Sequence, residues 1–245
     1  MLTDETLAYL FDGKPHLLSE SMTTWVASSR QFTTFVTTFR DKIRKKIRVN
    51  QDPESILDLR LELETAYLLL QERSLNLVYE PLQAERTRSP DFAVTYTTSL
   101  TFMVEVTRIR SDAKNTSTHP QESTQSATPL VDERLVDAVC SKLGQLTAQH
   151  SNVLMVGMDV LSLTDHKLRA TMLHLQHRAE RNDPSFLQRH RFRDRADFFH
   201  HYQRLSEVLV RGADLQTGGT ISWVNPQAKH PLPSKVRTAL YHSHA

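Results

Sequence analysis

Large apolar residues near the start of the chain recur every three or four positions, which is the spacing of one face of a helix. The residues in this apolar stripe are Trp25, Phe32, Phe35 and Phe39. Ser19 or Ser21 has the side chain needed to cap the start of such a helix. The pattern therefore predicts one helix that runs into residues 40–48, within a helical N-terminal extension over residues 1–50.

A second helix is predicted over about residues 53–73, with Pro53 in its first turn. Apolar residues, most of them leucine, cover more than half of its circumference, so we expect it to be packed on two sides. Two acids, Glu62 and Glu64, lie within this apolar surround.

From Leu75 onward the pattern changes to one typical of strands. Residues 75–81 predict a strand that ends at a proline. Two further runs, residues 89–96 and 101–110, are rich in Thr, Val, Phe and Tyr, which suit a pleated surface. They predict a β-hairpin whose turn lies at residues 97–100.

Helices and strands alternate in the second half of the chain. A predicted helix over residues 131–150 precedes the continuous apolar run 152–159, which is typical of a strand buried on both faces. A strand, a helix and a strand in this order predict a crossover connection and helices flanking a sheet. Another helix is predicted at residues 164–181, and two closing strands are predicted around the turn 212–218.

Residues 111–130 contain no large apolar residue before Leu130, which predicts a mobile loop. Such a loop is either a lid over a site or a surface insertion. The chain shows no internal repeat and no linker between two cores. We therefore expect a single domain over residues 1–245, with its core at 53–160 and helices and closing strands at 161–245.

Composition narrows the class of protein. A chain that is 39% apolar and 24% charged is ordinary for a globular domain. The net charge of +2 gives no strong attraction to nucleic acid or membrane, so any such attraction needs a local patch. The single cysteine, Cys140, excludes an internal disulfide and suits a reducing cytoplasm. No apolar run approaches the roughly 18 residues of a membrane span, so we expect a cytoplasmic protein without a membrane partner.

Two acids interrupt the apolar hairpin, Asp91 at the start of its first strand and Glu105 in the middle of its second. Burying a carboxylate is costly unless it is paired or coordinates a metal. Side chains alternate along a strand, so Glu105 and Thr107 share one face, and Asp91 can approach Glu105 across the hairpin. Two converging carboxylates with waters would bind Mg²⁺ or Mn²⁺, and a helix acid could complete the site. A solvated acid pair without function is the alternative.

These residues resemble a known family. A helix acid, Pro90-Asp91 at a strand start and Glu105-Val-Thr107 on the next strand are similar to the motif of the PD-(D/E)XK nuclease superfamily. The resemblance covers about residues 55–160. It implies an α/β protein with a three-layer α/β/α, restriction-endonuclease-like core around a mixed sheet of four or five strands. It also implies a metal-dependent hydrolase that cleaves phosphodiester bonds in DNA.

The resemblance also implies roles for particular side chains. Asp91 and Glu105 would be metal ligands. Glu62, which begins a Glu-Leu-x-x-Ala segment, would be the helix acid, with Glu64 as the fallback. Gln145, on the following helix, matches a position where members often present a polar residue to the site.

One residue departs from the motif. Members carry a lysine two residues after the glutamate, where this chain has Thr107, whose hydroxyl brings no charge. Arg108 points to the opposite face of a regular strand. Lys142, on the following helix, could reach the site instead, as displaced lysines do in some members. A second hypothesis stays open, namely a catalytically inactive nuclease-fold module that binds nucleic acid or a protein partner.

Cations are concentrated in residues 40–48 and at the end of the hairpin. The candidates for contacts with DNA phosphates are Lys42, Arg44, Lys45, Lys46, Arg48, Arg108 and Arg110. For the first cluster, a solvated helix end is the alternative. A second basic cluster lies between Arg189 and Arg195. DNA is the expected partner, and the sequence leaves a homodimer or a protein partner open.

Overall fold

The computed structural model describes residues 2–81, 89–110, 132–158, 163–212 and 219–243. Over these residues one mixed sheet holds six strands in sequence order. The strands are β1 (Leu75–Tyr79), β2 (Phe92–Tyr96), β3 (Leu100–Ile109), β4 (Asn152–Met158), β5 (Leu205–Gly212) and β6 (Thr220–Val224). The central strands β3, β4 and β5 are parallel, and the outer pairs are antiparallel.

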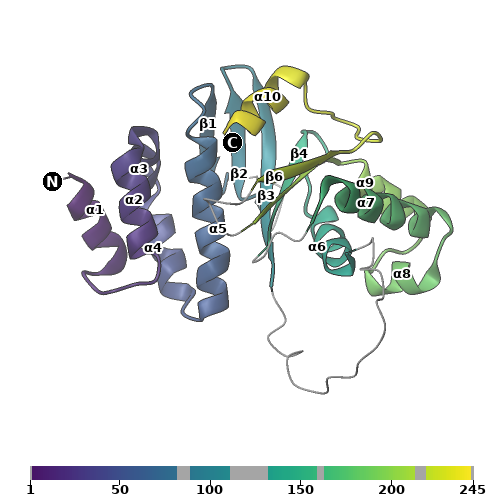
Figure 1. Ribbon diagram of the computed structural model, residues 1–245, viewed down its shortest axis with the longest axis horizontal. Coiled ribbons are helices and arrows are strands. Elements are labelled where there is room, and N and C mark those ends of the chain that lie inside the picture. Colours follow the sequence, from purple (N-terminus) through teal and green to yellow (C-terminus); the bar gives the residue numbers. More distant parts are fainter. Residues whose placement is uncertain (1, 82–88, 111–131, 159–162, 213–218, 244–245) are drawn as a thin grey trace.

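Helices cover both faces of this sheet, which confirms the predicted α/β class and is compatible with three layers (Figure 1). One face packs against α5 (Pro53–Leu69) and α10 (Ser234–His242), whose apolar residues share one core with β1 to β3. The other face carries α6 (Glu133–Leu143), α7 (Asp165–Glu180), α8 (Pro184–Arg189) and α9 (Arg195–Tyr202). The described residues contain six strands, more than the four or five that the resemblance implies.

The N-terminal extension is helical but consists of several helices, so the expected single helix is wrong. Its members are α1 (Leu2–Phe11), α2 (Ser19–Ser28), α3 (Arg30–Thr38) and α4 (Arg40–Val49). The chain leaves the helical path at Ser29, which is extended and accepts a 3.2 Å hydrogen bond from the Phe32 N–H as the cap of α3. Leu18, rather than either of the two serines, precedes α2 as its N-cap residue.

Helix α5 lies between the N-terminal helices and the sheet (Figure 1). Asp52 caps its start by accepting a 2.9 Å hydrogen bond from the Ser55 N–H. It approaches β4 closely at Gly157, where a Cβ would lie 2.8 Å from Cδ1 of Leu61 and nearer still to its Cδ2. A side chain at this point of β4 would therefore require the Leu61 side chain to shift.

The remaining helices differ in length from the sequence expectation. Helix α6 ends at Leu143, so Gln145 lies beyond it rather than on it. Residues 184–199, which the sequence pattern left unassigned, contain α8 and the first part of α9. The predicted loop 111–130 and most of the turn 212–218 lie outside the described residues. None of the helices in the described part of the chain is long and apolar enough to cross a membrane.

Candidate functional site

Asp91 lies immediately before β2, with its carboxylate turned toward β3. Its Oδ2 accepts a 2.7 Å hydrogen bond from the backbone N–H of Val106. Phe92 pairs with Val104, and this register carries Asp91 to the level of Glu105. Burial, and next the charge of Glu105, raise the pKa of Asp91 to about 6. The hairpin therefore brings the two acids close enough to repel each other.

A lysine from the neighbouring helix meets Glu105. Glu105 is 6% exposed, and its Oε1 lies 2.7 Å from Nζ of Lys142. Lys142 stands in the last turn of α6, the crossover helix between β3 and β4. Thr107, two residues along β3, is partly exposed and pairs with Val156 of β4. The cation beside the glutamate thus comes from α6 and not from the strand.

The two acids of α5 lie in different surroundings. Burial, and next the charge of Asp91, raise the pKa of Glu62 to about 7. Glu64 is 3% exposed, and its Oε1 lies 3.5 Å from Nε of Arg211 on β5. Residues two apart on a helix point in nearly opposite directions, so only one of them can face Asp91. That residue is Glu62.

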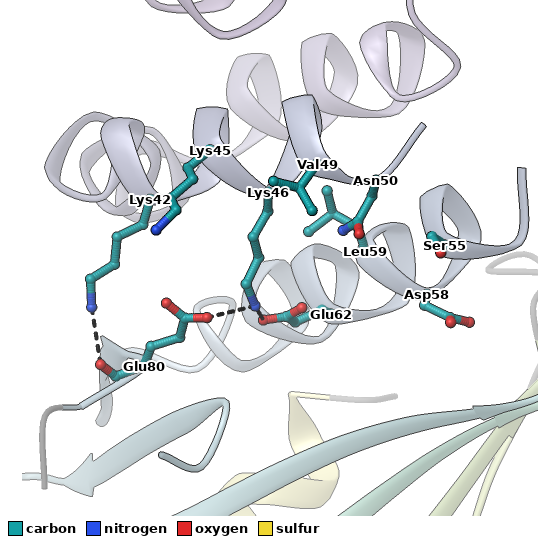
Figure 2. Close-up of a pocket in the computed structure, with 10 residues that line it drawn as sticks. All are labelled: Lys42, Lys45, Lys46, Val49, Asn50, Ser55, Asp58, Leu59, Glu62 and Glu80. Carbon is teal, nitrogen blue, oxygen red and sulfur yellow. Dashed lines mark hydrogen bonds and ion pairs between the residues drawn. The ribbon is translucent and has the colours of Figure 1, made fainter. Parts of the chain in front are cut away.

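A second lysine, Lys46 of α4, binds the helix acid (Figure 2). Its Nζ lies 2.6 Å from Oε1 of Glu62 and 2.8 Å from Oε1 of Glu80, and 4.9 Å from the centre of the Tyr79 ring. Burial raises the pKa of the Tyr79 hydroxyl, and the Glu62 charge raises it further. Sequence reasoning placed Lys46 among the phosphate contacts and missed this pair. The sequence feature that could have indicated this pair is the position of Lys46 next to Ile47. Ile47 is buried, so that side of α4 faces α5.

The other candidate cations of α4 divide into three groups. Lys42 donates to the backbone carbonyls of Tyr79 and Glu80, at 2.9 and 3.0 Å. Arg44 and Arg48 both bind the carboxylate of Asp12. For the exposed Lys45 ammonium, the described part of the chain offers no hydrogen bond or ion pair.

The two arginines of the hairpin anchor α5. Arg108, whose side chain is 5% exposed, binds Asp58 at 2.9 Å and also binds Glu54. Arg110 binds the same Asp58 at 2.6 Å. These ion pairs occupy both guanidinium groups within the protein, so their first role is to hold α5 on β3. Whether they also contact DNA stays a prediction.

Two further candidates lie on the face of the sheet that α6 to α9 cover, the face from which Lys142 reaches Glu105. Gln145 follows α6, and its amide donates to the carbonyl of Ser141 at 3.4 Å. In the second basic cluster Arg189 binds Asp137 at 2.5 Å and Arg193 binds Asp197 at 3.1 Å. The sheet separates this cluster from α4.

The donor chemistry of the site fits a hard divalent cation held by two carboxylates. Within the described residues, no three His, Cys, Asp or Glu side chains gather as a metal-binding group. Mg²⁺ often takes only one or two carboxylates from a protein, and waters and phosphate oxygens supply the rest. Raised pKa values at Glu62 and Asp91 reflect buried negative charge that a cation near Asp91 and Glu105 would offset.

No protein-family model, curated protein or solved structure matches this chain. Its function is therefore inferred from the residues and their geometry.

Proposed function

We propose that this chain is a divalent-metal-dependent, nuclease-like hydrolase that cleaves phosphodiester bonds in DNA. The observation that carries the proposal is the ion pair between Glu105 and Lys142. In the family that the hairpin resembles, a lysine near this glutamate orients the attacking water. Here Thr107 occupies the strand position, and Lys142 brings a cation to the same carboxylate from α6.

The residues of the site have different roles in the proposed reaction. Asp91 and Glu105 would hold Mg²⁺ or Mn²⁺, which would activate water and offset the charge that develops on the phosphate. Lys142 lies beside Glu105, where its ammonium can hold a water and a phosphate oxygen. Glu62, with a pKa of about 7, exchanges its proton near neutral pH, as a general base requires. Lys46 fixes the position of Glu62.

One observation favours the alternative, a catalytically inactive module that binds nucleic acid or a protein partner. Lys46 and Lys142 already neutralise Glu62 and Glu105, as a bound cation would. A site that has replaced its metal with two ammonium groups would keep the fold without the reaction. The two hypotheses differ in whether DNA is cleaved or only bound.

The partner and the compartment follow from the same proposal. DNA is the substrate that we favour, because the resemblance points to it and because lysines of α4 border the acid site. The only cysteine, Cys140, is buried as a free thiol, which suits the reducing cytoplasm that we infer as the location.

The decisive experiment is a cleavage assay on supercoiled and linear DNA with Mg²⁺ or Mn²⁺. Wild-type protein is compared with Asp91→Ala and Glu105→Ala, and Glu20→Ala, in an exposed position on α2, serves as the control. We expect cleavage by the wild type and the control and none by the two site variants. Cleavage that persists in both site variants would refute the proposed ligands, and DNA binding without cleavage by the wild type would establish the inactive module.

A further inference from the structure

A cavity of about 540 Å³ opens between α4 and α5 (Figure 2). One wall includes Lys45 and Val49 of α4 and the Asn50 that follows them, and the α5 wall includes Ser55, Leu59 and Glu62. Glu62 is the helix acid of the proposed site, so the cavity adjoins the place where the reaction would occur. Its volume falls within the roughly 300–1,000 Å³ of small-ligand pockets, and the proposed cleavage step uses only Glu62 and Lys46 among its lining residues.

The acids of this cavity already have cationic partners. Lys46 bridges Glu62 and Glu80, and Arg108 and Arg110 bind Asp58. An anion entering the cavity therefore meets carboxylates whose charge is largely compensated.

Lys45 gives the cavity a cation that can bind such an anion. Figure 2 shows its side chain reaching from α4 into the space above Glu80, with no interaction drawn to it. Lys42 and Lys46, on the same wall, are held by carbonyl and carboxylate oxygens. Lys45 is exposed, and the described residues supply no partner for its ammonium. A lysine ammonium binds phosphate as a compact point charge.

The other end of the cavity has a different chemistry. Val49 is 71% exposed at its rim, and Leu59, 2% exposed, forms its floor. Beside them stand the polar side chains of Asn50 and Ser55 (Figure 2). The Lys46–Glu62 ion pair lies between Lys45 and this apolar pair (Figure 2), and the cavity groups outside that ion pair run from a cation through an apolar strip to amide and hydroxyl groups. The same order occurs along a nucleotide, from its phosphate to the face of its base and then to the polar edge of that base.

We propose that this cavity binds one unpaired nucleotide of the substrate, with its phosphate at Lys45 and its base between Val49 and Leu59. The inference rests on the proposed function and names the substrate class. A base in a duplex is stacked and paired, so it enters a cavity only after leaving the helix, which costs free energy. DNA with a single-stranded segment, a frayed end or a flap presents such a base without that cost. The preferred substrate is therefore DNA that is unpaired beside the bond to be cleaved.

The first arm of the test measures binding alone. The full chain in EDTA is titrated into a labelled single strand of DNA and into the blunt duplex of the same sequence, at several salt concentrations. The variants are Lys45→Ala and Val49→Asp. Their matched controls are Lys235→Ala, an exposed lysine of α10, and Leu17→Asp, at a residue that is also 71% exposed.

We expect the single strand to bind about tenfold more tightly than the duplex. Lys45→Ala should weaken that binding about fivefold and reduce the slope of log K against log salt by about 0.7, the value for one single-strand phosphate contact. Val49→Asp should weaken it at least about fivefold, since contact with one base face contributes that much or more. The control variants should stay within about twofold of the wild type. Equal or tighter binding of the duplex, a Val49→Asp effect no larger than that of Leu17→Asp, or no binding of either DNA would overturn the inference.

The second arm separates this inference from the proposed function. Cleavage of both DNAs with Mg²⁺ is compared for wild type and Asp91→Asn. Cleavage that depends on Asp91 but shows no preference for unpaired DNA leaves the nuclease proposal standing and refutes the cavity. Single-strand binding that depends on Lys45 and Val49, without cleavage, supports the cavity and refutes the nuclease.

Discussion

The ammonium of Lys142 lies 2.7 Å from the carboxylate of Glu105, although the two residues are 37 positions apart. The crossover from β3 through α6 to β4 brings them together, because α6 packs over the strand that carries the acid. At the strand position two residues beyond Glu105, where the resembled motif has its lysine, the chain has Thr107. Any cleavage by this site should therefore depend on the helix lysine.

Removing that lysine tests this dependence. Lys142→Ala should lower the cleavage rate by about 10²-fold or more, the usual range for a group that assists proton transfer. Adding Thr107→Lys to that variant should restore at least about a tenth of the lost cleavage rate, since residue 107 lies on the same face of β3 as Glu105. Thr101→Lys, on the same strand face but four residues before Glu105, is the control and should recover nothing. Unchanged cleavage by Lys142→Ala would remove Lys142 from the mechanism, and a melting curve of each variant shows whether it is folded.

The raised pKa of Glu62 predicts how stability changes with pH. Burial raises this pKa from 4.5 to about 7, so the folded protein holds the proton more tightly than the unfolded chain. The free energy of unfolding should therefore fall as the pH rises from about 4.5 to about 7, and it should be level above that range. Glu62→Gln has no titrating carboxyl at this position. Over this pH range its free energy of unfolding should therefore fall by roughly 2–3 kcal/mol less than that of the wild type.

Urea unfolding at several pH values between 5 and 8 measures this difference. Glu20→Gln, in an exposed position of α2, should keep the wild-type slope. Identical slopes for wild type and Glu62→Gln would contradict the burial of a proton at Glu62.

Metal binding should stabilise the fold through Asp91. A ligand at 100 times its dissociation constant adds about 2.7 kcal/mol to the free energy of unfolding, which corresponds to roughly 5–10 °C in a chain of this size. We expect Mg²⁺ to raise the melting temperature of the wild type but not of Asp91→Asn. Glu64→Gln should melt lower, because Arg211 loses its buried partner, yet keep the Mg²⁺ shift. A shift that survives in Asp91→Asn or disappears in Glu64→Gln would place the metal elsewhere.

The strands of this fold could be predicted because each carries a short-range signal. β3 is rich in residues that suit a pleated surface, and β4 is a continuous apolar run of the buried parallel kind. The helix between them sets the crossover. The break at Ser29 could not be found in the same way, since the apolar stripe continues through it from Trp25 to Phe32. Nothing in the spacing of apolar residues distinguishes one helix from two that share a stripe.

The residues of the candidate site also differ in whether a local sequence pattern could predict them. Asp91 and Glu105 follow from hairpin geometry, in which neighbouring strands fix which residues lie opposite each other. The choice between Glu62 and Glu64 and the pair with Lys46 depend on how α4 and α5 pack, which no local pattern specifies. A buried acid within a leucine-rich helix predicts some partner, but only the packing of the helices shows which one.

The contact between Gly157 of β4 and Leu61 of α5 gives a last prediction, because it holds the helix that carries Glu62. Gly157→Ala places a methyl group where the Leu61 side chain already lies, so it should destabilise the fold by about 1–3 kcal/mol. Adding Leu61→Ala to that variant should cost less than Leu61→Ala costs alone, since each change makes room for the other. Gly144→Ala is the matched control, because a Cβ there meets no heavy atom within 4 Å. Urea unfolding of the single and double variants measures the coupling, and strictly additive changes would show that α5 does not rest on β4 at this point.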